Sequence, residues 1–337
     1  MRVLILTKNW GRNFTGATLA TQYLVNRWIG YGAFIDVYTL NIGECIRNER
    51  IHVYKADSIR KLKKIIFSNK KAYVESTIGY SDDHFGYILH EFSIPFIHTY
   101  HGNWPDAKNI NFEMWLKSYY FIPLYKKTFK CAEIVVNVSR YMETFTKRYS
   151  KETCVIHNGI EIKQMESQIK EYNTYLMVGN IDKRKYGLLP EVANFLRRMD
   201  ESIKIEIYGQ VLDIKLAQKI SACANIKLLG EQKEIPYKKY VGFINTSKME
   251  NLSISVCEAI KNQLPVFCFD VGGLTEVVED YRTGFIFKCF STKEMANSLA
   301  SYCNGDKLLI SSDALYDFDW EIAGKEYYEI MMRRCNK

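Results

Sequence analysis

The sequence predicts an α/β protein built from two doubly wound, Rossmann-like domains. Three observations carry this prediction. The chain has 337 residues, which favours two domains over one. Short apolar runs alternate with segments of helical spacing, as expected for parallel strands joined by right-handed crossover helices. The alternation pauses in a polar stretch near 162–173 and then restarts, so one domain is expected on either side of it.

The first half of the chain begins with the apolar run "VLILT", which is typical of a strand covered on both faces. Further strands are expected at 33–40, 71–76, 95–102, 133–139 and 153–159. Helices are expected at 15–32, 82–92 and 112–130.

The second half repeats this rhythm. Its expected strands are 174–180, 204–210, 226–230, 240–247, 264–270 and 284–288. Its expected helices are 187–199, 217–224, 252–262 and 274–280. Because open parallel sheets bind ligands beyond the carboxyl ends of their strands, the loops after these strands are where a site is expected.

Composition bears on the cellular compartment of the chain and on the charge of its partners. The nine cysteines form no C-x-x-C and are odd in number, which favours a reduced, cytoplasmic chain over a disulfide framework. The short apolar run at the start is not a signal peptide, and no stretch approaches the ~20 apolar residues of a membrane span. The net charge of +8 favours anionic partners without choosing among phosphates, acidic lipid and nucleic acid.

Two glutamates stand out in "KMENLSISVCEA". Glu250 follows an expected strand and precedes a helix that should begin near Leu252 or Ser253, with Asn251 and Ser253 as candidate caps. Glu258 lies eight residues further on, which turns the helix about 80° past two full turns and separates the carboxylates by ~10 Å. A helix N-terminus suits a diphosphate, and carboxylates accept hydrogen bonds from vicinal hydroxyls. The pair therefore predicts a nucleotide-sugar site.

The stretch "ENLSISVCEAIKNQLPV", followed by "DVGGLTEVV" and "TGFIF", resembles the E-x7-E region of glycosyltransferase family 4 (glycosyl transferases group 1), whose members are retaining enzymes with the GT-B fold. Further matching motifs follow the family order: "IPFIHTYHG", "CAEIVVNVS", "VIHNGIE", "VGNIDKRKYG" and "DWEIAGKEYYEIM". The resemblance implies two Rossmann-like domains facing each other across a cleft. Residues 1–165 would form the acceptor-side domain, 166–320 the nucleotide-sugar domain, and 321–337 a helix crossing back to the first domain.

The resemblance also implies residue roles. His101 would lie beside the donor sugar, Lys185 would neutralise the phosphates, and Glu250 would bind hydroxyls of the transferred sugar; these three are the expected catalytic residues. Glu258 would hold the ribose, and Arg184 would assist Lys185. The other expected donor-binding residues are Gly16, Asn180, Gly209, Asn251, Leu252 and Ser253. Asn180 stands where the family usually has arginine, a departure that bears on donor identity.

The expected activity is transfer of a hexosyl or N-acetylhexosaminyl group, with retention, from a nucleotide diphosphate sugar. The donor is expected to be UDP-linked. The acceptor would be a hydroxyl of a glycan, glycolipid or other glycoconjugate in surface polysaccharide synthesis. No metal or cofactor is expected, because fixed cations would stabilise the leaving diphosphate.

Three alternatives remain open: a non-catalytic GT-B partner subunit, a sugar-nucleotide epimerase and a DNA-modifying glycosyltransferase. The presence of both glutamates, Lys185 and His101 argues against the first. The basic charge permits the third, although nucleic acid is not the expected partner. The sequence does not define an oligomeric state.

Three further patterns have competing explanations. His98 and His101 form an H-x-x-H, but strand alternation would place them on opposite faces, against a metal site. The "DFD" ending at Asp319 resembles a metal-binding D-x-D, yet Asp319 is better placed to cap the final helix. The stretch 114–130 mixes aromatics with lysines, which fits either a peripheral helix on the anionic inner membrane face or an ordinary packed helix.

Overall fold

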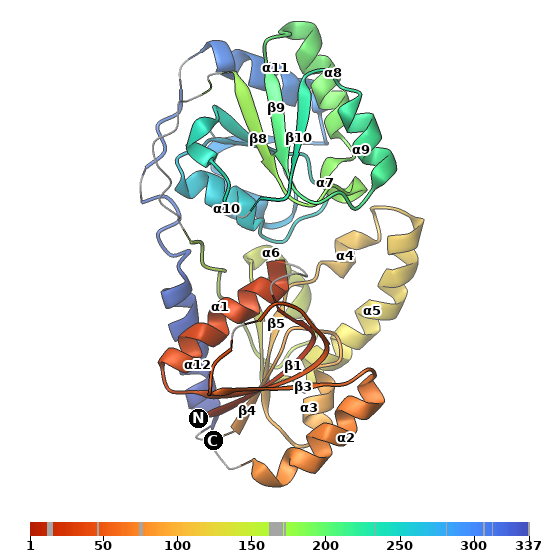
Figure 1. Ribbon diagram of the computed structural model, residues 1–337, viewed down its shortest axis with the longest axis vertical. Helices are drawn as coiled ribbons and strands as arrows, with labels where there is room; N and C mark the ends of the chain where they lie inside the picture. Colours follow the sequence, from red (N-terminus) through yellow and green to blue (C-terminus); the bar gives the residue numbers. More distant parts are fainter. Residues whose placement is uncertain are drawn as a thin grey trace. The chain divides into compact units, whose positions relative to one another are not determined.

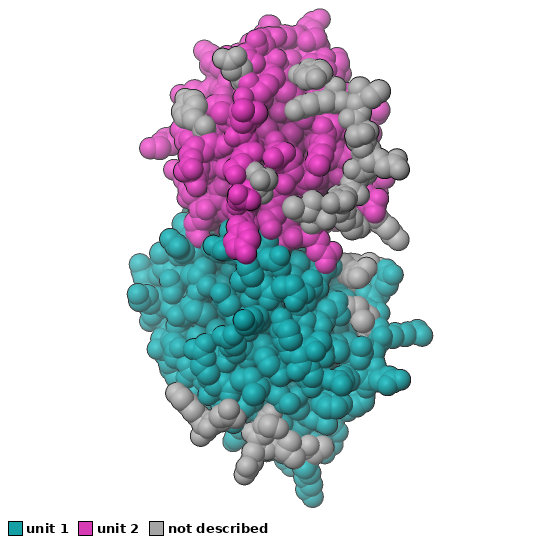
Figure 2. Space-filling view, turned by 90° about the vertical axis from the view of Figure 1, so that its left-hand side faces the viewer, with its two compact units in different colours: residues 1–159, 317–337 teal, residues 160–316 magenta. Residues whose placement is uncertain are grey.

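The computed structural model describes residues 1–11, 16–45, 47–73, 77–161, 171, 173–232, 234–280, 282–305, 307–311 and 313–335. The chain divides into two compact units (Figure 2): unit 1 comprises 1–159 with 317–337, and unit 2 comprises 160–316. The domain boundary predicted at 165/166 lies outside the described residues.

Unit 1 contains a seven-stranded parallel sheet with the order β3-β2-β1-β4-β5-β6-β7 (Figure 1). Its strands are β1 (Arg2–Trp10), β2 (Phe34–Ile42), β3 (Ile51–Lys55), β4 (Thr77–Ser81), β5 (Phe96–Tyr100), β6 (Ile134–Asn137) and β7 (Thr153–Val155). The chain builds outward from β1 to β3 and then restarts at β4 on the other side of β1. The topological switch point of unit 1 therefore lies between β1 and β4.

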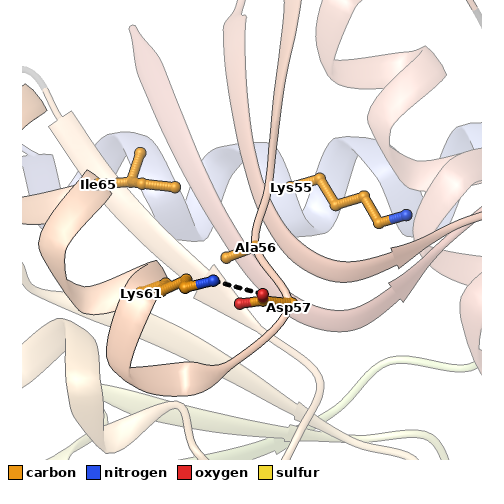
Figure 3. Close-up of a pocket in the computed structure, with 5 residues that line it drawn as sticks. All are labelled: Lys55, Ala56, Asp57, Lys61 and Ile65. Carbon is orange, nitrogen blue, oxygen red and sulfur yellow. Dashed lines mark hydrogen bonds and ion pairs between the residues drawn. The ribbon is translucent and has the colours of Figure 1, made fainter.

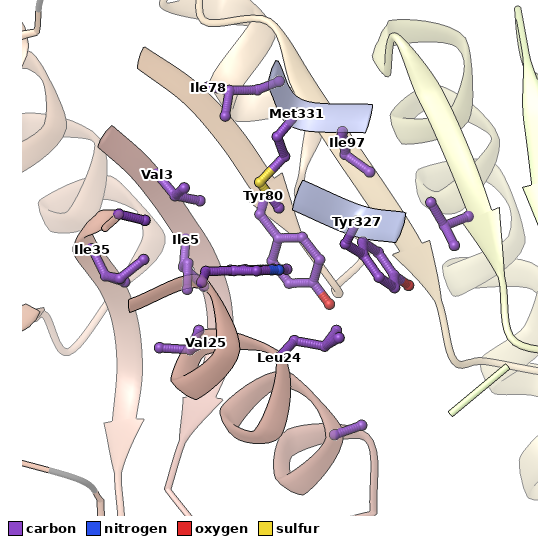
Figure 4. Close-up of a cluster of buried hydrophobic side chains, with 14 of the residues drawn as sticks. Val3, Ile5, Leu24, Val25, Ile35, Ile78, Tyr80, Ile97, Tyr327 and Met331 are labelled. Atoms are coloured by element: carbon purple, nitrogen blue, oxygen red, sulfur yellow. The ribbon is translucent and has the colours of Figure 1, made fainter. Parts of the chain in front are cut away.

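The helices of unit 1 are α1 (Gly16–Gly30), α2 (Ile59–Asn69), η1 (Lys70–Ala72), α3 (Tyr87–Glu91), α4 (Trp104–Ala107), α5 (Phe112–Cys131), α6 (Arg140–Thr146) and α12 (Trp320–Cys335). Helix α12 follows unit 2 in sequence but lies alongside α1 (Figure 1). Tyr327 and Met331 of α12 enter the buried cluster around Tyr80, Val3 and Ile5 (Figure 4). Full burial of each such side chain contributes about 1.5–3 kcal/mol, which fixes α12 to unit 1.

Unit 2 contains a six-stranded parallel sheet with the order β10-β9-β8-β11-β12-β13. Its strands are β8 (Thr174–Val178), β9 (Lys204–Tyr208), β10 (Ile226–Gly230), β11 (Gly242–Asn245), β12 (Val266–Phe269) and β13 (Gly284–Phe287). Its helices are α7 (Lys183–Tyr186), α8 (Leu189–Met199), α9 (Ile214–Ser221), η2 (Tyr237–Lys239), α10 (Ile254–Lys261), η3 (Gly272–Glu276) and α11 (Thr292–Asn304). Here the switch point lies between β8 and β11.

The strand predicted at 71–76 is wrong. Lys71 belongs to the short helix η1, residues 74–76 lie outside the description, and the strand at this place is β4. Its sequence "TIGYS" contains Gly79, and glycine ordinarily weakens a strand. Glycine is required there because a Cβ would lie 2.7 Å from Cβ of Phe96 on β5.

Other departures from the predicted elements are smaller. The helix predicted at 274–280 is the 3₁₀ helix η3, which begins two residues earlier. Seven elements have no counterpart among the predicted ones: β3, α2, α4, α6, α7, η2 and α11. Over the described ranges, none of the helices combines the length and the apolar character needed to traverse a lipid bilayer.

Candidate active site

The loop after β8 presents two cations at the switch point of unit 2. Gly179 has φ +142, which favours glycine, and its carbonyl accepts a hydrogen bond of 3.0 Å from the hydroxyl of Tyr186. Asp182 caps α7 by accepting from the backbone N–H of Lys185 at 2.9 Å. These bonds close the loop, and they place the side chains of Arg184 and Lys185 on a fixed, one-turn helix.

Gly209, an expected donor-binding residue, has a packing reason to be glycine. Its φ is +156, and a Cβ at this position would lie 1.9 Å from the carbonyl oxygen of Gly179. The loops after β8 and β9 therefore touch through two glycines. Asn180, which follows Gly179, is exposed at this edge of the sheet.

Glu250 lies in the loop after β11 and is buried, with 8% of its surface exposed. Its Oε1 accepts a hydrogen bond of 2.8 Å from the hydroxyl of Ser247. The same oxygen lies 3.5 Å from Nζ of Lys185 and 3.9 Å from Nη1 of Arg184. The start of η3 lies against the backbone of Glu250, which requires glycine at Gly272, because a Cβ there would meet the carbonyl oxygen of Glu250 at 1.8 Å.

The charge of Glu250 is stabilised by its neighbours. Burial alone would raise the pKa of this carboxyl, but Lys185, Arg184 and the Ser247 hydroxyl together hold the pKa below its ordinary value. Glu250 is therefore ionised at neutral pH. The two cations in turn have a negative partner at a fixed distance, which orients them before any ligand binds.

Backbone contacts tie the two loops together. The hydroxyl of Thr246 donates to the carbonyl of Lys185 at 2.7 Å, and the N–H of Lys248 donates to the carbonyl of Arg184 at 2.9 Å. The guanidinium of Arg184 also donates to the carbonyl of Met249 at 3.2 Å and lies 3.5 Å from a carboxylate oxygen of Asp182. Arg184 is thus held by Met249 and Asp182 as well as by Glu250. For Lys185, Glu250 is the ion-pair partner among the described residues.

Helix α10 begins directly after this loop. Leu252 and Ser253 are buried and Asn251 is half-buried. Ser253 occupies the N-cap position, but its side chain makes no capping hydrogen bond, and its hydroxyl lies 3.2 Å from that of Ser255. The expectation that a side chain caps this helix is therefore wrong at Ser253. The first N–H groups of a helix have no acceptor within it, so this N-terminus suits an anion.

Glu258 is on α10, half-buried, and its Oε2 accepts a hydrogen bond of 2.5 Å from the hydroxyl of Tyr237. Burial and the nearby carboxylate raise the pKa of Tyr237 well above its ordinary value, so the hydroxyl keeps its proton and donates. Burial also raises the pKa of Cys257, and both Glu258 and Glu250 add to that rise. Both glutamates therefore lie close enough to Cys257 to act on the same thiol.

Two expected site residues belong to unit 1. His101 follows β5 and is half-buried, and burial lowers its pKa to about 4. His98, within β5, is fully buried against Tyr125 and Phe129; burial first, and then the nearby His101 and His84, lower its pKa to about 3. Both imidazoles are neutral at pH 7. Gly16 is the exposed first residue of α1, and residues 12–15 before it lie outside the description.

Neither metal pattern gathers ligands. Across the described parts of the chain, no group of three His, Cys, Asp or Glu side chains could hold a metal ion. The carboxylate of Asp319 accepts a hydrogen bond of 2.6 Å from the N–H of Glu321 in the first turn of α12, which confirms its capping role.

A pocket elsewhere in unit 1 is lined by Lys55, Ala56, Asp57, Lys61 and Ile65 (Figure 3). It lies between the end of the edge strand β3 and the start of α2. Nζ of Lys61 already pairs with Asp57 at 2.5 Å. This pocket is two strands away from the switch point, so the candidate site does not include it.

Solved structures match the chain from end to end. Anabaena Alr3699/HepE in complex with UDP and glucose has a TM-score of 0.75 and 17% identity, covering 99% of this chain and 100% of that one. WaaG, a glycosyltransferase involved in lipopolysaccharide biosynthesis, has a TM-score of 0.73 and 13% identity, covering 99% and 98%. Two parallel sheets with interleaved helices, matched in this way, are the GT-B fold of glycosyltransferases.

Two family models identify the family. The model for Glycosyltransferase Family 4 matches residues 16–164, and that for Glycosyl transferases group 1 matches residues 160–310. The chain belongs to this family of GT-B glycosyltransferases.

Curated relatives match a shorter stretch. A Staphylococcus aureus poly(ribitol-phosphate) alpha-N-acetylglucosaminyltransferase is 29% identical over 152 residues, which is 41% of this chain and 30% of that protein. A glycogen synthase from Thermodesulfovibrio yellowstonii is 28% identical over 111 residues, 30% of this chain and 22% of that protein. The matched stretches thus span less than a third of either relative's length.

Two residues with distinctive environments were not predicted. Tyr237 is remote in sequence from Glu258, and no local pattern signals their contact. Asp82 directly follows β4, and a carboxylate after a strand is a usable signal. It was missed because the strand was predicted at 71–76, which left Asp82 inside an expected helix.

Proposed function

We propose that this glycosyltransferase transfers a sugar, with retention of configuration, from a UDP-linked donor to a hydroxyl of a glycan, glycolipid or other glycoconjugate acceptor. The observation that carries the proposal is the buried Glu250 paired with Lys185 at the switch point of unit 2. The N-terminus of α10 begins beside them. A fixed cation, free N–H groups and a carboxylate are what a diphosphate joined to a sugar requires.

In the proposed reaction the donor diphosphate lies on Lys185, Arg184 and the first N–H groups of α10. Glu250 accepts hydrogen bonds from hydroxyls of the transferred sugar, and Glu258 accepts them from the ribose. As the glycosyl–phosphate bond breaks, negative charge grows on the leaving phosphate and the cations stabilise it. The acceptor oxygen attacks from the same face and gives its proton to that phosphate. Neutral His101 assists at the sugar as a hydrogen-bonding group rather than as a cation.

The reaction is proposed to need no metal or cofactor. Lys185 and Arg184 are held in place by Glu250, Asp182 and backbone carbonyls, so positive charge is already fixed where the diphosphate would lie. Chelation with EDTA should leave turnover unchanged. Abolition of turnover by EDTA, with restoration by added Mg²⁺, would contradict the proposal.

We also propose peripheral contact with an anionic membrane surface, through α5. Phe112, Trp115, Leu116 and Tyr119 recur at helical spacing and are 75%, 40%, 58% and 65% exposed. Two lysines of the same helix lie over tyrosine rings: Lys126 over that of Tyr149, and Lys127 over that of Tyr87. An exposed aromatic stripe on a lysine-bearing helix suits the interfacial region of a bilayer. A membrane-bound acceptor would then be presented to unit 1.

The donor is tested first with thermal unfolding against a panel of UDP-, GDP-, ADP- and CDP-linked sugars. A ligand at 100 times its Kd stabilises a protein by about 2.7 kcal/mol, which is readily measured. We expect UDP-linked sugars to raise Tm and to be hydrolysed slowly without acceptor. NMR of the first-formed sugar product should then show the donor's anomeric configuration. An inverted product would contradict retention.

A further inference from the structure

The carboxylate of Asp82 lies at the switch point of unit 1 and has no role in the reaction described above. Asp82 directly follows Ser81, which pairs with Leu6 at the last position of the β1–β4 register. Thr7 is the next residue on β1, and its hydroxyl hydrogen-bonds with Asp82. Asp82 therefore occupies the position where open parallel sheets bind their ligands.

Two buried threonines hold this carboxylate. The hydroxyl of Thr21, on α1, donates to Oδ2 of Asp82 at 2.8 Å and lies 3.4 Å from the hydroxyl of Tyr80. Thr21 and Thr7 are 1% and 3% exposed, whereas Asp82 itself is half-buried. The carboxylate is thus fixed by two buried hydroxyls, while the residue remains partly exposed to solvent.

The environment of Asp82 is the opposite of that of Glu250. Each carboxylate follows the strand that restarts its sheet, β4 in unit 1 and β11 in unit 2. Glu250 has two cations within 4 Å, but among the described residues no lysine or arginine forms an ion pair with Asp82. Burial, with a smaller contribution from Asp83, raises the pKa of Asp82 to about 7. Two carboxyl groups whose pKa values are shifted in opposite directions usually have different roles.

We propose that Asp82, held by Thr7 and Thr21, binds a neutral hydroxyl of the sugar or polyol acceptor. The proposal rests on the proposed function, because it assigns the nucleotide to unit 2 and the acceptor to unit 1. A carboxylate accepts hydrogen bonds from one or two hydroxyls. Among the described residues no lysine or arginine pairs with Asp82 to bind a phosphate or carboxylate of the acceptor, so this subsite suits the uncharged, hydroxyl-bearing part of an acceptor.

The test uses the 337-residue chain with a saturating concentration of UDP and a panel of methyl glycosides of glucose, galactose and N-acetylglucosamine, together with ribitol. Saturation-transfer NMR reports polyol binding, and calorimetry reports UDP binding separately. We expect the wild type to bind at least one polyol. Asp82→Ala should weaken that binding at least tenfold and leave UDP affinity within twofold of wild type. Asp83→Ala is the matched control and should leave both within twofold.

Thr21→Val provides a second variant, because it removes the supporting hydroxyl with little change of shape. It should weaken polyol binding about threefold or more without changing UDP affinity, and it decides the question if Asp82→Ala disturbs UDP binding as well. A wild type that binds none of the polyols, or polyol binding unchanged in both variants, would overturn the proposal. Failure of the wild type to bind UDP would instead overturn the proposed function.

Discussion

The hydroxyl of Tyr237 donates a 2.5 Å hydrogen bond to Oε2 of Glu258, joining the short helix η2 to α10. Tyr237 is 7% exposed, so it has little freedom to turn away. The bond fixes one oxygen of Glu258, the residue proposed to bind the ribose. Tyr237 is therefore a positioning residue for nucleotide binding.

Tyr237→Phe should weaken UDP binding by about tenfold, since loss of one hydrogen bond to a charged group costs about 1.5 kcal/mol. Glu258→Gln should weaken it further. Tyr316→Phe is the matched control, because Tyr316 is 74% exposed, and it should bind UDP as the wild type does. Titration calorimetry measures all three. Equal affinities in Tyr237→Phe and the control would remove Tyr237 from the site.

Glu250→Gln should separate sugar from nucleotide recognition. UDP alone has no sugar for this residue to contact, and loss of a negative charge 3.5 Å from Lys185 favours the diphosphate. UDP affinity should therefore stay level or rise, while turnover falls about 10²-fold because contacts to the reacting sugar strengthen in the transition state. Calorimetry and a turnover assay distinguish the two effects. A variant that loses UDP affinity as Glu258→Gln does would refute this division of labour.

Lys185→Ala should lower turnover by about 10²-fold or more, the usual cost of removing one preorganised charge contact. The same change should raise the pKa of Glu250, because Lys185 is the stronger of its two cationic neighbours. Lys183→Ala, an exposed lysine on the same short helix, is the control and should turn over normally. Wild-type turnover by Lys185→Ala would mean that another group stabilises the leaving phosphate.

The buried histidines should make unit 1 sensitive to acid. The pKa of His98 is about 3 in the folded protein, whereas an unfolded histidine titrates near 6.5. Between these values the unfolded chain binds one more proton, so His98 lowers the free energy of unfolding by about 1.4 kcal/mol per pH unit as pH falls. The contribution is fully present above pH 6.5.

His98→Asn should accordingly flatten the pH dependence of unfolding between pH 6.5 and 4, whatever its effect on stability at pH 7. Urea titrations followed by tryptophan fluorescence are suitable, since all five tryptophans lie within unit 1. The exposed His90 supplies the control variant, His90→Asn. If the free energy of unfolding depends on pH equally in both variants, His98 is not the source of the acid sensitivity.

Membrane contact through α5 is tested by Leu116→Ser with Tyr119→Ser. Removing two exposed apolar side chains from the proposed interface should reduce co-sedimentation with phosphatidylglycerol vesicles several-fold at fixed salt. The matched control combines Leu309→Ser and Tyr316→Ser, which change the same residue types at exposed positions of unit 2. If both double variants sediment alike, the stripe on α5 has another purpose.

Most of the architecture could be predicted because it follows from periodicity. Buried strands such as β1 and β12 are continuous apolar runs, and amphipathic helices such as α8 separate them. β4 was misplaced because Gly79 weakens the local signal, and only the approach of Phe96 from a distant strand explains it. A pattern within a short stretch of sequence cannot show a contact with a residue on another strand.

The candidate site was predictable in part. The position of Glu250 and Glu258 around a helix start follows from their spacing. The ion pair of Glu250 with Lys185 does not, because it joins loops separated by 65 residues through the switch point of the sheet. Nor does spacing show that Arg184 is held by Met249 and Asp182. These contacts depend on which loops the fold brings together.

The placement of α12 also bears on how the protein is made. Its side chains Trp320, Ala323, Tyr327 and Met331 complete a core whose other buried members are supplied by residues 1–159. During synthesis the ribosome must therefore release all of 160–316 before that core can close. Unit 2, which is continuous in sequence, can complete its own core earlier. Until then, the apolar face that α12 covers stays exposed on the nascent N-terminal sheet. Exposed apolar surface promotes aggregation, so we expect the sheet to depend most on chaperones during this period.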